Sequence, residues 1–546
     1  MRVLGINAVF HDSSAALVVD GKIVAAAEEE RFNRRKHGKP CVPFSVWELP
    51  ERAIAWCLER GGLGPRDLDA VAYSYDPALA AADNDLLGNE YEGLRTYYVR
   101  RLPDFLATLF GGFDPAKVRF VPHHVAHAAS AYLCAPFARC ATMALDGRGE
   151  RASFLAGHVV DGELETLGTV PLPHSLGLRY EDLTVHLGFH RSSDEYKVMG
   201  LAAYGRPRFA ARLHEEMHAT GIGYHAPPID FNAYCAPRSA HAESFSPEHA
   251  DLAASVQLCL QETLIAIARE LQARTGERDL TLAGGVALNC VANSALAADG
   301  TFERIWVQPA AGDAGTSLGA ALFVARQHGA AIEPMRTAAL GRSWDAAQLR
   351  AQLDVANLAY TAPDDLAESV AAVLADNGLV AWFQGPSEFG PRALGHRSLL
   401  AHPGHSDNLR RLNDVKGREA FRPVAPMVLV ERAADIFTGP LPSPYMLFTH
   451  DVREGWRERI PAVTHVDGTA RVQTVDAADE PLMAAVLRAF ERRTGLPVLV
   501  NTSLNTAGRP MVDAPSDALE VFGSTPVDVL AIGPFLLARR AQLVAA

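Results

Sequence analysis

The sequence predicts an α/β protein whose N-terminal half is internally duplicated and whose C-terminal part is a separate α/β domain. Two observations lead to this prediction: a strand–turn–strand pattern occurs twice, and helical segments follow each copy. The length of 546 residues adds a third, because one hydrophobic core does not organise a chain of this size. With 48% hydrophobic and 21% charged residues, the composition is that of a globular protein.

The first copy of the pattern lies within residues 3–26. Apolar runs occupy residues 3–7 and 15–19, and Asp20-Gly21 separates the second run from a third at 22–26. An Asp-Gly pair between two β-prone runs favours a tight hairpin.

The second copy repeats this order within residues 141–170. Runs at 141–145 and 152–160 flank a polar turn, and Asp161-Gly162 precedes a run at 163–170. The recurrence predicts a duplicated domain rather than one continuous sheet.

Further elements are expected outside the two copies. A helix is predicted from Asp251 to Thr275, because Gly276 follows as a stop signal. Near residues 335–365 the pattern changes: residues 344–353 are predicted to be helical, and a strand is predicted at 379–383.

The charge distribution argues against a broad nucleic-acid surface. The formal net charge is −13, and a polyphosphate backbone needs a cationic face. Residues 392–422 are the exception, with seven basic and three acidic side chains. A local basic pocket is therefore compatible with the sequence.

Other features indicate the compartment. No run of about 18 apolar residues occurs, and the first residues become polar too early for a secretory leader. The seven cysteines contain no C-x-x-C pair, so we expect reduced thiols rather than disulfides or a thiolate zinc site. We therefore predict a cytoplasmic protein that neither spans a membrane nor binds nucleic acid, with its oligomeric state left open.

A histidine-rich helix is the first candidate site. His123 and His127 are spaced i,i+4, which places both imidazoles on one helical face within reach of one divalent ion. Asp146, at the end of the first strand of the second copy, is a candidate third ligand. The alternative is a helix with surface histidines, with Asp146 as a turn residue.

Three glycine-containing segments are candidates for nucleotide binding. Gly284 and Gly285 follow a predicted strand and precede a helix start that includes Asn289, although close packing alone accounts for many such pairs. Asp313 stands beside a second glycine-rich helix start, as a metal ligand or an N-cap. Lys197 lies in the third glycine-containing segment. It is either a cation that binds phosphate or a surface lysine before a buried helix.

Basic and polar residues are denser near the C-terminus. Several cations with hydroxyl and amide donors suit a substrate with multiple phosphates, and a solvated basic surface is the alternative. These residues are Arg392, Arg397, Lys416, Arg422, Arg471, Ser503 and Asn505.

Taken together, the residues resemble the NodU/CmcH-type O-carbamoyltransferase family over nearly the whole chain. Seven motifs carry the resemblance in order: F-H-D-S-S-A-A-L from Phe10 to Leu17, H-H-V-A-H-A-A-S-A-Y, K-V-M-G-L-A-A-Y-G, A-G-G-V-A-L-N, G-D-A-G-T-S-L-G-A-A, F-G-P-R-A-L-G-H-R-S and N-T-S-L-N.

The resemblance implies a fold and a reaction. Residues 1–345 would form a duplicated actin-like ATPase (ribonuclease H-like) domain, and residues 346–546 a YrdC-like α/β domain. The C-terminal domain would convert ATP and carbamoyl phosphate to carbamoyl-adenylate and pyrophosphate. The N-terminal domain would then transfer the carbamoyl group to a hydroxyl of a small natural product, for example a sugar of an antibiotic.

The resemblance also implies roles for individual residues. His11 matches the general base, and an iron-type metal site falls on His123, His127, Asp146 and Asp313. The C-terminal set would bind ATP, with its Mg²⁺, and carbamoyl phosphate. One departure is the pair Ala420-Phe421, where the family has two aromatic residues.

Two other classes remain open. An actin-like sugar kinase would share the duplicated half and transfer the γ-phosphate of ATP, but it leaves the basic C-terminal segment unexplained. An actin-like assembly protein would bind nucleotide without an acceptor.

Overall fold

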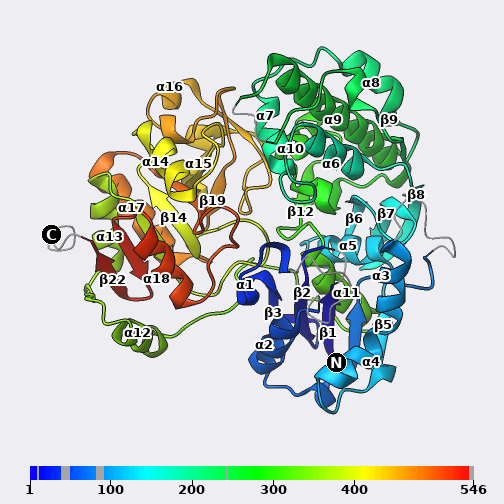
Figure 1. Ribbon diagram of the computed structural model, residues 1–546, viewed down its shortest axis with the longest axis horizontal. Helices are drawn as coiled ribbons and strands as arrows, with labels where there is room; N and C mark the ends of the chain where they lie inside the picture. The colour runs from blue at the N-terminus through cyan, green and yellow to red at the C-terminus, as the bar shows by residue number, and fades with distance from the viewer. Residues whose placement is uncertain (9–10, 39–48, 81–90, 241–243, 540–546) are drawn as a thin grey trace. The chain divides into compact units, whose positions relative to one another are not determined.

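The computed structural model describes residues 1–8, 11–38, 49–80, 91–240 and 244–539, and Phe10 and Cys41 lie outside these ranges. The chain divides into two compact units, each described by itself (Figure 1). The first comprises Met1–Asn33 and His37–Met335, and the second comprises Arg34–Lys36 and Arg336–Ala546. The domain boundary predicted at 345/346 falls within the second unit.

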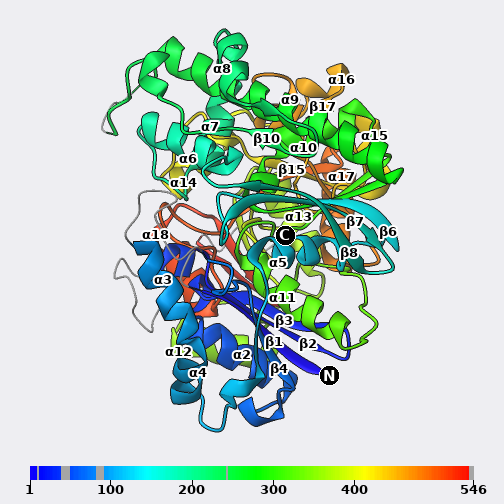
Figure 2. The same ribbon diagram turned by 90° about the vertical axis from the view of Figure 1, so that its right-hand side faces the viewer.

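The first unit contains two five-stranded sheets of the same topology. In the first sheet the order is β3-β2-β1-β4-β5, with antiparallel pairing among the first three strands and parallel pairing from β1 onward. Figure 2 shows β1, β2, β3 and β4 of this sheet side by side. Their bounds are β1 Arg2–Asn7, β2 Ser14–Val19, β3 Lys22–Glu28, β4 Ala70–Tyr73 and β5 Val118–Phe120.

The second sheet repeats this arrangement strand for strand. Its order is β8-β7-β6-β11-β12, again with three antiparallel strands followed by parallel pairs. The strands are β6 Arg139–Leu145, β7 Ala152–Val160, β8 Glu163–Pro171, β11 Asp279–Ala283 and β12 Arg304–Val307. The predicted duplication is confirmed, and the repeated topology is that of the actin-like, ribonuclease H-like class.

Each copy ends in a helix that covers the sheet of the other copy. Helix α5 (His123–Tyr132) follows β5 and packs on β6 and β11, whereas α11 (Ala314–Gln327) follows β12 and packs on β1 and β2. The two helices also pack against each other. Because α5 and α11 pack across the two sheets in this way, the end of β6 and the starts of α5 and α11 lie close together.

The remaining helices of the first unit lie outside this centre. Helix α9 starts at Pro247, before the predicted Asp251, because Ser246 caps it by accepting a hydrogen bond from the His249 N–H. Gly276, with φ of 68°, ends it as predicted. The helices are α1 Glu30–Asn33, α2 Glu51–Gly61, α3 Tyr91–Arg100, α4 Leu102–Leu109, α6 Leu176–His186, α7 Glu195–Ala202, α8 Ala210–Glu216, α9 Pro247–Thr275 and α10 Cys290–Asp299; two short strands are β9 His218–Ala219 and β10 Tyr224–His225.

Among the described residues, α9 is the one helix that is long and apolar enough to cross a membrane, with a mean hydropathy of 1.3 over its 18-residue window. In the structure 67% of that window is buried within the protein. Helix α9 packs against α7, α8 and α10. This packing is that of a core helix.

The second unit is built on a seven-stranded mixed sheet of order β19-β15-β20-β14-β13-β21-β22. Its strands are β13 Val380–Phe383, β14 Arg397–Ala401, β15 Ala425–Leu429, β19 Gln473–Val475, β20 Val498–Ser503, β21 Val529–Ile532 and β22 Phe535–Ala538. A three-stranded sheet contains β16 Phe437–Thr438, β17 His450–Val452 and β18 Thr469–Ala470. Its helices are α12 Ala346–Val355, α13 Leu366–Ala375, α14 Asp407–Lys416, α15 Val430–Ile436, α16 Glu454–Arg457, α17 Pro481–Thr494 and α18 Pro515–Ser524.

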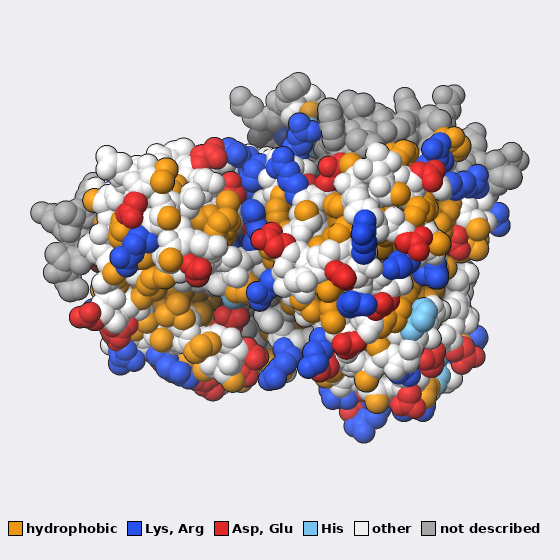
Figure 3. Space-filling view, turned by 90° about the horizontal axis from the view of Figure 1, so that it is seen from below, with side chains coloured by type: hydrophobic (Ala, Val, Ile, Leu, Met, Phe, Trp, Pro, Cys, Tyr) orange, Lys and Arg blue, Asp and Glu red, His pale blue; other side chains and the backbone are white. Residues whose placement is uncertain are grey.

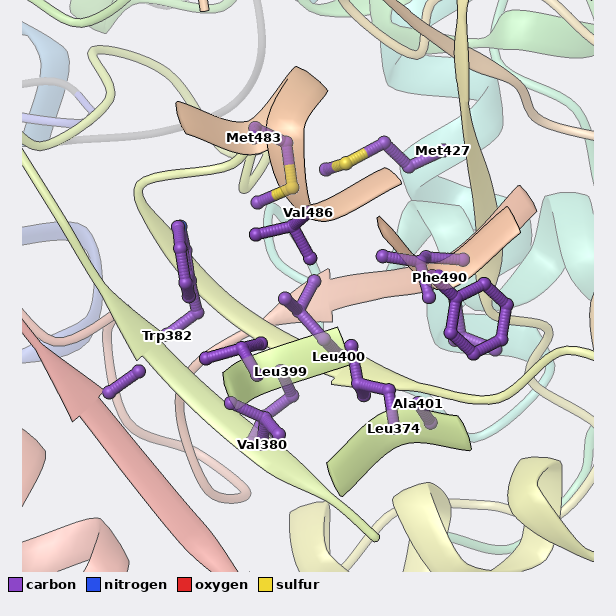
Figure 4. Close-up of a cluster of buried hydrophobic side chains, with 14 of the residues drawn as sticks. Leu374, Val380, Trp382, Leu399, Leu400, Ala401, Met427, Met483, Val486 and Phe490 are labelled. Atoms are coloured by element: carbon purple, nitrogen blue, oxygen red, sulfur yellow. The ribbon is translucent and has the colours of Figure 1, made fainter. Parts of the chain in front are cut away.

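The core of the second unit lies between this sheet and the helices α13 and α17. Figure 4 shows Trp382, Leu400 and Phe490 among the side chains that fill it. The Trp382 indole is 1% exposed and donates its N–H to the Gly395 carbonyl oxygen at 2.7 Å, so its polar atom is satisfied inside the core. The same bond fixes the loop between β13 and β14.

A buried carboxyl makes the stability of the first unit sensitive to pH. The Glu29 side chain accepts hydrogen bonds from the N–H groups of Arg52 (3.1 Å) and Ala53 (2.9 Å) at the start of α2, and burial raises its pKa from 4.5 to about 7. Between pH 4.5 and about pH 7, Glu29 therefore stays protonated in the native state but is ionised in the unfolded chain. Stability is expected to fall by about 3 kcal/mol as pH rises through this window.

The change Glu29→Gln should remove most of this pH dependence, because the amide stays neutral and still accepts both bonds. Urea unfolding at pH 5 and pH 8 measures it, with Glu59→Gln on the exposed face of α2 as the matched control. Equal pH dependence in wild type and Glu29→Gln would contradict the assignment.

Candidate functional site

The metal-type site of the first unit forms where strands end and helices begin. His123 and His127 lie on α5, Asp146 follows β6, and Asp313 precedes α11. One ligand atom from each of the four residues lies within 4.8 Å of the other three. His123 and His127 are buried, so the alternative of surface histidines is wrong.

The four donor atoms lie close together in pairs. His123 Nε2 lies 3.4 Å from Asp146 Oδ2, and His127 Nε2 lies 3.4 Å from Asp313 Oδ1. The two Nε2 atoms are 3.1 Å apart. Asp313 occupies the N-cap position of α11, as the alternative expected, but its side chain makes no capping hydrogen bond there. Two imidazoles and two carboxylates in this arrangement suit a divalent transition metal.

A second layer of residues orients these four side chains. The His123 Nδ1 atom lies 3.2 Å from the Ser74 carbonyl oxygen, which leaves Nε2 facing the site. Asp146 Oδ1 accepts a hydrogen bond from the Gly285 N–H at 2.9 Å. Glu150 accepts the His123 N–H at 2.8 Å and so caps α5, whose N-cap Pro122 offers no side-chain acceptor. Ser74 and Glu150 carried no motif that sequence reasoning singled out.

In this site the histidines and the carboxylates shift one another's pKa values. Burial alone would lower the pKa of His123, but its hydrogen bond with Asp146 and the charge of Asp313 raise that pKa to about 9. Burial would favour a neutral Asp146, yet the bond from His123 and the charge of His127 hold the pKa of Asp146 below its ordinary value. A cation is thus favoured between the carboxylates, as a proton or as a metal ion.

The close packing of α11 on α5 sets the position of both histidines. A Cβ on Gly319 would lie 1.9 Å from the Ala126 carbonyl oxygen, so Gly319→Ala must displace α5. We expect a loss of stability of about 1–3 kcal/mol. Urea unfolding measures it, with Gly523→Ala, where a Cβ meets nothing within 4 Å, as the control. A Gly319→Ala protein as stable as wild type would contradict the prediction.

His11 lies in the turn between β1 and β2, held between two oxygen atoms. Its Nδ1 lies 3.0 Å from Asp12 Oδ2, and its Nε2 lies 2.7 Å from the Ser192 carbonyl oxygen. The Asn7 side chain donates to the carbonyl oxygens of His11 (2.7 Å) and Asp12 (3.1 Å) and so fixes the turn. Both the general-base prediction and the alternative, a turn residue bonded to backbone, are compatible with this geometry.

The residues predicted to bind nucleotide in the first unit occupy distinct environments. Gly284 has φ of 90°, and a Cβ there would lie 2.0 Å from the Leu145 carbonyl oxygen, so the chain turns where a side chain does not fit. Asn289 caps α10 and exchanges hydrogen bonds with Gln257. Lys197 lies within α7, with Nζ 3.1 Å from Asp194 Oδ2. Among these residues, Gly285 contacts the metal-type site directly, through its N–H.

In the second unit, Lys416 is the centre of a cationic cluster. Its Nζ donates to the Ser503 hydroxyl at 3.0 Å and to Asn505 Oδ1 at 2.6 Å, so three predicted residues meet. Lys416 is 5% exposed. Burial and the positive charges of Arg418, Arg422 and Lys36 hold its pKa well below the ordinary value. On the face drawn in Figure 3, acidic and basic side chains intermix.

The other predicted cations of the second unit differ in environment. Arg392 lies in the loop between β13 and β14, and Arg471 lies between β18 and β19. Arg397 is fully buried, stacks on Phe383 at 3.8 Å and donates to the carbonyl oxygens of Gln384 (2.7 Å), Gly385 (3.1 Å) and Arg342 (3.1 Å). This geometry favours a scaffolding role for Arg397 over direct phosphate binding, because its terminal nitrogens already serve main-chain oxygens.

The sequence matches two protein families, one in each half of the chain. The family Carbamoyltransferase N-terminus matches residues 2–113 and 112–322, and the family Carbamoyltransferase C-terminus matches residues 371–539. The nodulation protein NolNO of Sinorhizobium fredii is 39% identical over 98% of this chain and 80% of that protein. The nodulation protein U of Bradyrhizobium diazoefficiens is 34% identical over 93% of each.

These matches identify the class of protein. The chain belongs to the carbamoyltransferase family and is an enzyme that transfers carbamoyl groups. Among solved structures, HypF of T. kodakarensis matches 60% of this chain and 48% of that chain at 17% identity, with a TM-score of 0.35.

Proposed function

We propose that the enzyme is an ATP-dependent O-carbamoyltransferase that acts on a hydroxyl of a small natural product. The second unit would convert ATP and carbamoyl phosphate to carbamoyl-adenylate and pyrophosphate, and the first unit would transfer the carbamoyl group. The proposal includes a cytoplasmic location and a role in secondary metabolism, such as antibiotic biosynthesis. Family membership supports carbamoyl phosphate as the donor and a hydroxyl as the acceptor.

The cationic cluster around Lys416 carries this proposal. Three positive charges act on the buried Lys416 side chain, and Glu419 pairs with one of them, Arg422, at 3.5 Å, so a bound anion would further stabilise the charged form of Lys416. Arg418, Arg422 and Lys36 supply those charges, and Ser503 and Asn505 supply polar atoms beside Lys416. ATP with carbamoyl phosphate would provide such anions, and the cluster would stabilise charge as the α-phosphate is attacked.

We propose that His123, His127, Asp146 and Asp313 hold a divalent metal, with iron as the expected ion. The donor set fits, because four ligand atoms converge and the two carboxylates favour a cation between them. When bound, such an ion would supply Lewis-acid polarisation of a phosphate or carbonyl oxygen. Elemental analysis of the purified protein tests its identity; zinc or manganese in place of iron would contradict the choice of ion.

Around this centre, the chain's own residues would orient and deprotonate the acceptor. His11 is proposed as the general base, which requires its Nε2 to exchange the Ser192 carbonyl oxygen for the acceptor hydroxyl. Gly284 and Gly285 would let a phosphate approach the backbone closely. Lys197 and Asn289 are proposed to bind the same nucleotide.

The decisive experiment measures the products of ATP turnover. Incubation with ATP, Mg²⁺ and carbamoyl phosphate is expected to release pyrophosphate, and AMP is expected once an acceptor is added. Release of ADP with a phosphorylated sugar would instead establish the sugar-kinase alternative. Mass spectrometry across a panel of glycosylated natural products, searching for the gain of one carbamoyl group, identifies the acceptor.

A further inference from the structure

The end of the loop between β13 and β14 is held in place by side chains of the core. Three buried side chains donate hydrogen bonds to three consecutive carbonyl oxygens, and neither a helix nor a strand satisfies those oxygens. The pairs are Asn501 to Ala393 (3.0 Å), Gln473 to Leu394 (2.8 Å) and Trp382 to Gly395 (2.7 Å). Arg392 directly precedes this segment, so the position of its main chain is fixed as well.

Glu388 holds the N–H groups of the same segment. It is 1% exposed, and its Oε1 accepts the N–H groups of Leu394 (2.6 Å), His396 (3.0 Å) and Arg397 (3.2 Å). Its Oε2 is buried and has no hydrogen-bond partner among the described residues. A buried carboxylate of this kind costs free energy unless positive charge lies near it. The negative charge of Glu388 acts on the neighbouring His396.

Both ring nitrogens of His396 face oxygen atoms that accept hydrogen bonds. Nδ1 lies 3.3 Å from the Gln384 carbonyl oxygen, and Nε2 lies 3.0 Å from Oε1 of Glu480, immediately before α17. A neutral imidazole donates from one nitrogen, whereas an imidazolium donates from both. The geometry therefore favours the charged form of His396, which joins both ends of the loop to Glu480.

The charges around His396 favour the same form. Burial alone would lower the pKa of His396, but its hydrogen bond with Glu480 and the charge of Glu388 raise that pKa above its ordinary value, against the opposing charge of Arg397. Glu388 lies in the same loop, Glu480 precedes α17, and Arg397 begins β14. Two carboxylates and one guanidinium around a ring that is 8% exposed are best balanced by a cation.

We propose that His396 is an imidazolium at neutral pH and a positioning residue that holds the loop carrying Arg392 against Glu480. The binding of ATP or carbamoyl phosphate by Arg392 rests on the function proposed above. Loss of the proton removes one of the two hydrogen bonds and leaves Glu388 and Glu480 without the cation between them. Because the proton is bound below the pKa and released above it, the loop should loosen, and pyrophosphate formation should weaken, as pH rises through the titration of His396.

The change Glu480→Gln tests the charge of His396 in the full-length protein. The amide oxygen still accepts the Nε2–H but carries no charge, so the ring should lose its proton at a pH lower by about 1 unit. NMR of protein labelled at the histidine Cε1 carbon measures the titration, with the His396 signal assigned by its loss in His396→Gln. The control Glu458→Gln neutralises an exposed carboxylate after α16 and should leave the titration midpoint unchanged.

Pyrophosphate release and ATP affinity, followed between about pH 6 and pH 10, test the positioning role. Glu480→Gln should move the alkaline fall of both to lower pH, by the amount that NMR gives. His396→Gln should lower turnover by about 10- to 100-fold below neutral pH, and adding Glu480→Gln to it should shift the fall no further. The titration of Lys416 contributes to the fall in every variant, so the differences between variants isolate His396.

The outcomes separate this inference from the proposed function. A His396 ring that is neutral at pH 7 would refute the imidazolium. Pyrophosphate release with the same pH dependence in wild type and Glu480→Gln would retain the adenylate and refute the positioning role. ATP affinity that follows the His396 titration, without any pyrophosphate, would retain the positioning role and refute the adenylate. A thermal unfolding transition like that of wild type shows that the variants are folded.

Discussion

The change Lys416→Met is expected to reduce pyrophosphate release from ATP and carbamoyl phosphate by about 100- to 1,000-fold. Methionine keeps the buried aliphatic stem but removes the ammonium group that donates to Ser503 and Asn505. The remaining Arg418 and Arg422 still attract phosphate, so the Michaelis constant for ATP should rise less than the turnover number falls. The assay is steady-state pyrophosphate release with magnesium in excess.

The matched control for Lys416→Met is Arg410→Met on the same helix, α14. Arg410 is 65% exposed, and among the described residues it pairs with Asp407 and Asp414 of its own helix, so its loss should leave turnover within about twofold of wild type. Equal losses in both variants would show that the charge of the helix, and not the Lys416 cluster, governs the reaction. Turnover unchanged in Lys416→Met would refute the role of the cluster.

Features encoded locally were predicted well from the sequence. Both Asp-Gly hairpins occur, with φ of 50° and 81° at Asp20-Gly21 and of 53° and 78° at Asp161-Gly162. The pairing of His123 with His127 was equally predictable, since i,i+4 spacing alone puts them on one helical face. Helix α12 begins two residues later than predicted because Asp345 serves as its N-cap, which is a boundary effect rather than a change of element.

Features that depend on tertiary packing were not predictable in this way. No pattern in the sequence shows that Arg397 stacks on Phe383 inside the core, because buried and solvated arginines look the same in a linear sequence. Ser193 and His37 carried no motif, and their contact forms only when the loop before α7 meets the turn after α1. The resemblance to a family supplied Asp313 as a ligand, which spacing alone left open against an N-cap.

The change His11→Asn separates the two halves of the proposed reaction. Asparagine is small enough for the turn, but it cannot take a proton near neutral pH. Acceptor carbamoylation should fall by about 100- to 10,000-fold, whereas pyrophosphate release in the second unit should persist. The control His328→Asn removes an imidazole that hydrogen-bonds to the Val324 carbonyl oxygen at the end of α11, and it should leave both activities unchanged.

The same variant also tests whether the His11 imidazole acts as a base or only as a part of the turn. If it acts as a base, a small diffusible base should replace it. Added imidazole should therefore restore part of the transfer in His11→Asn, which mass spectrometry of the carbamoylated acceptor measures. Loss of pyrophosphate release together with transfer would contradict the assignment of His11, since its turn between β1 and β2 would then serve the adenylate-forming step as well.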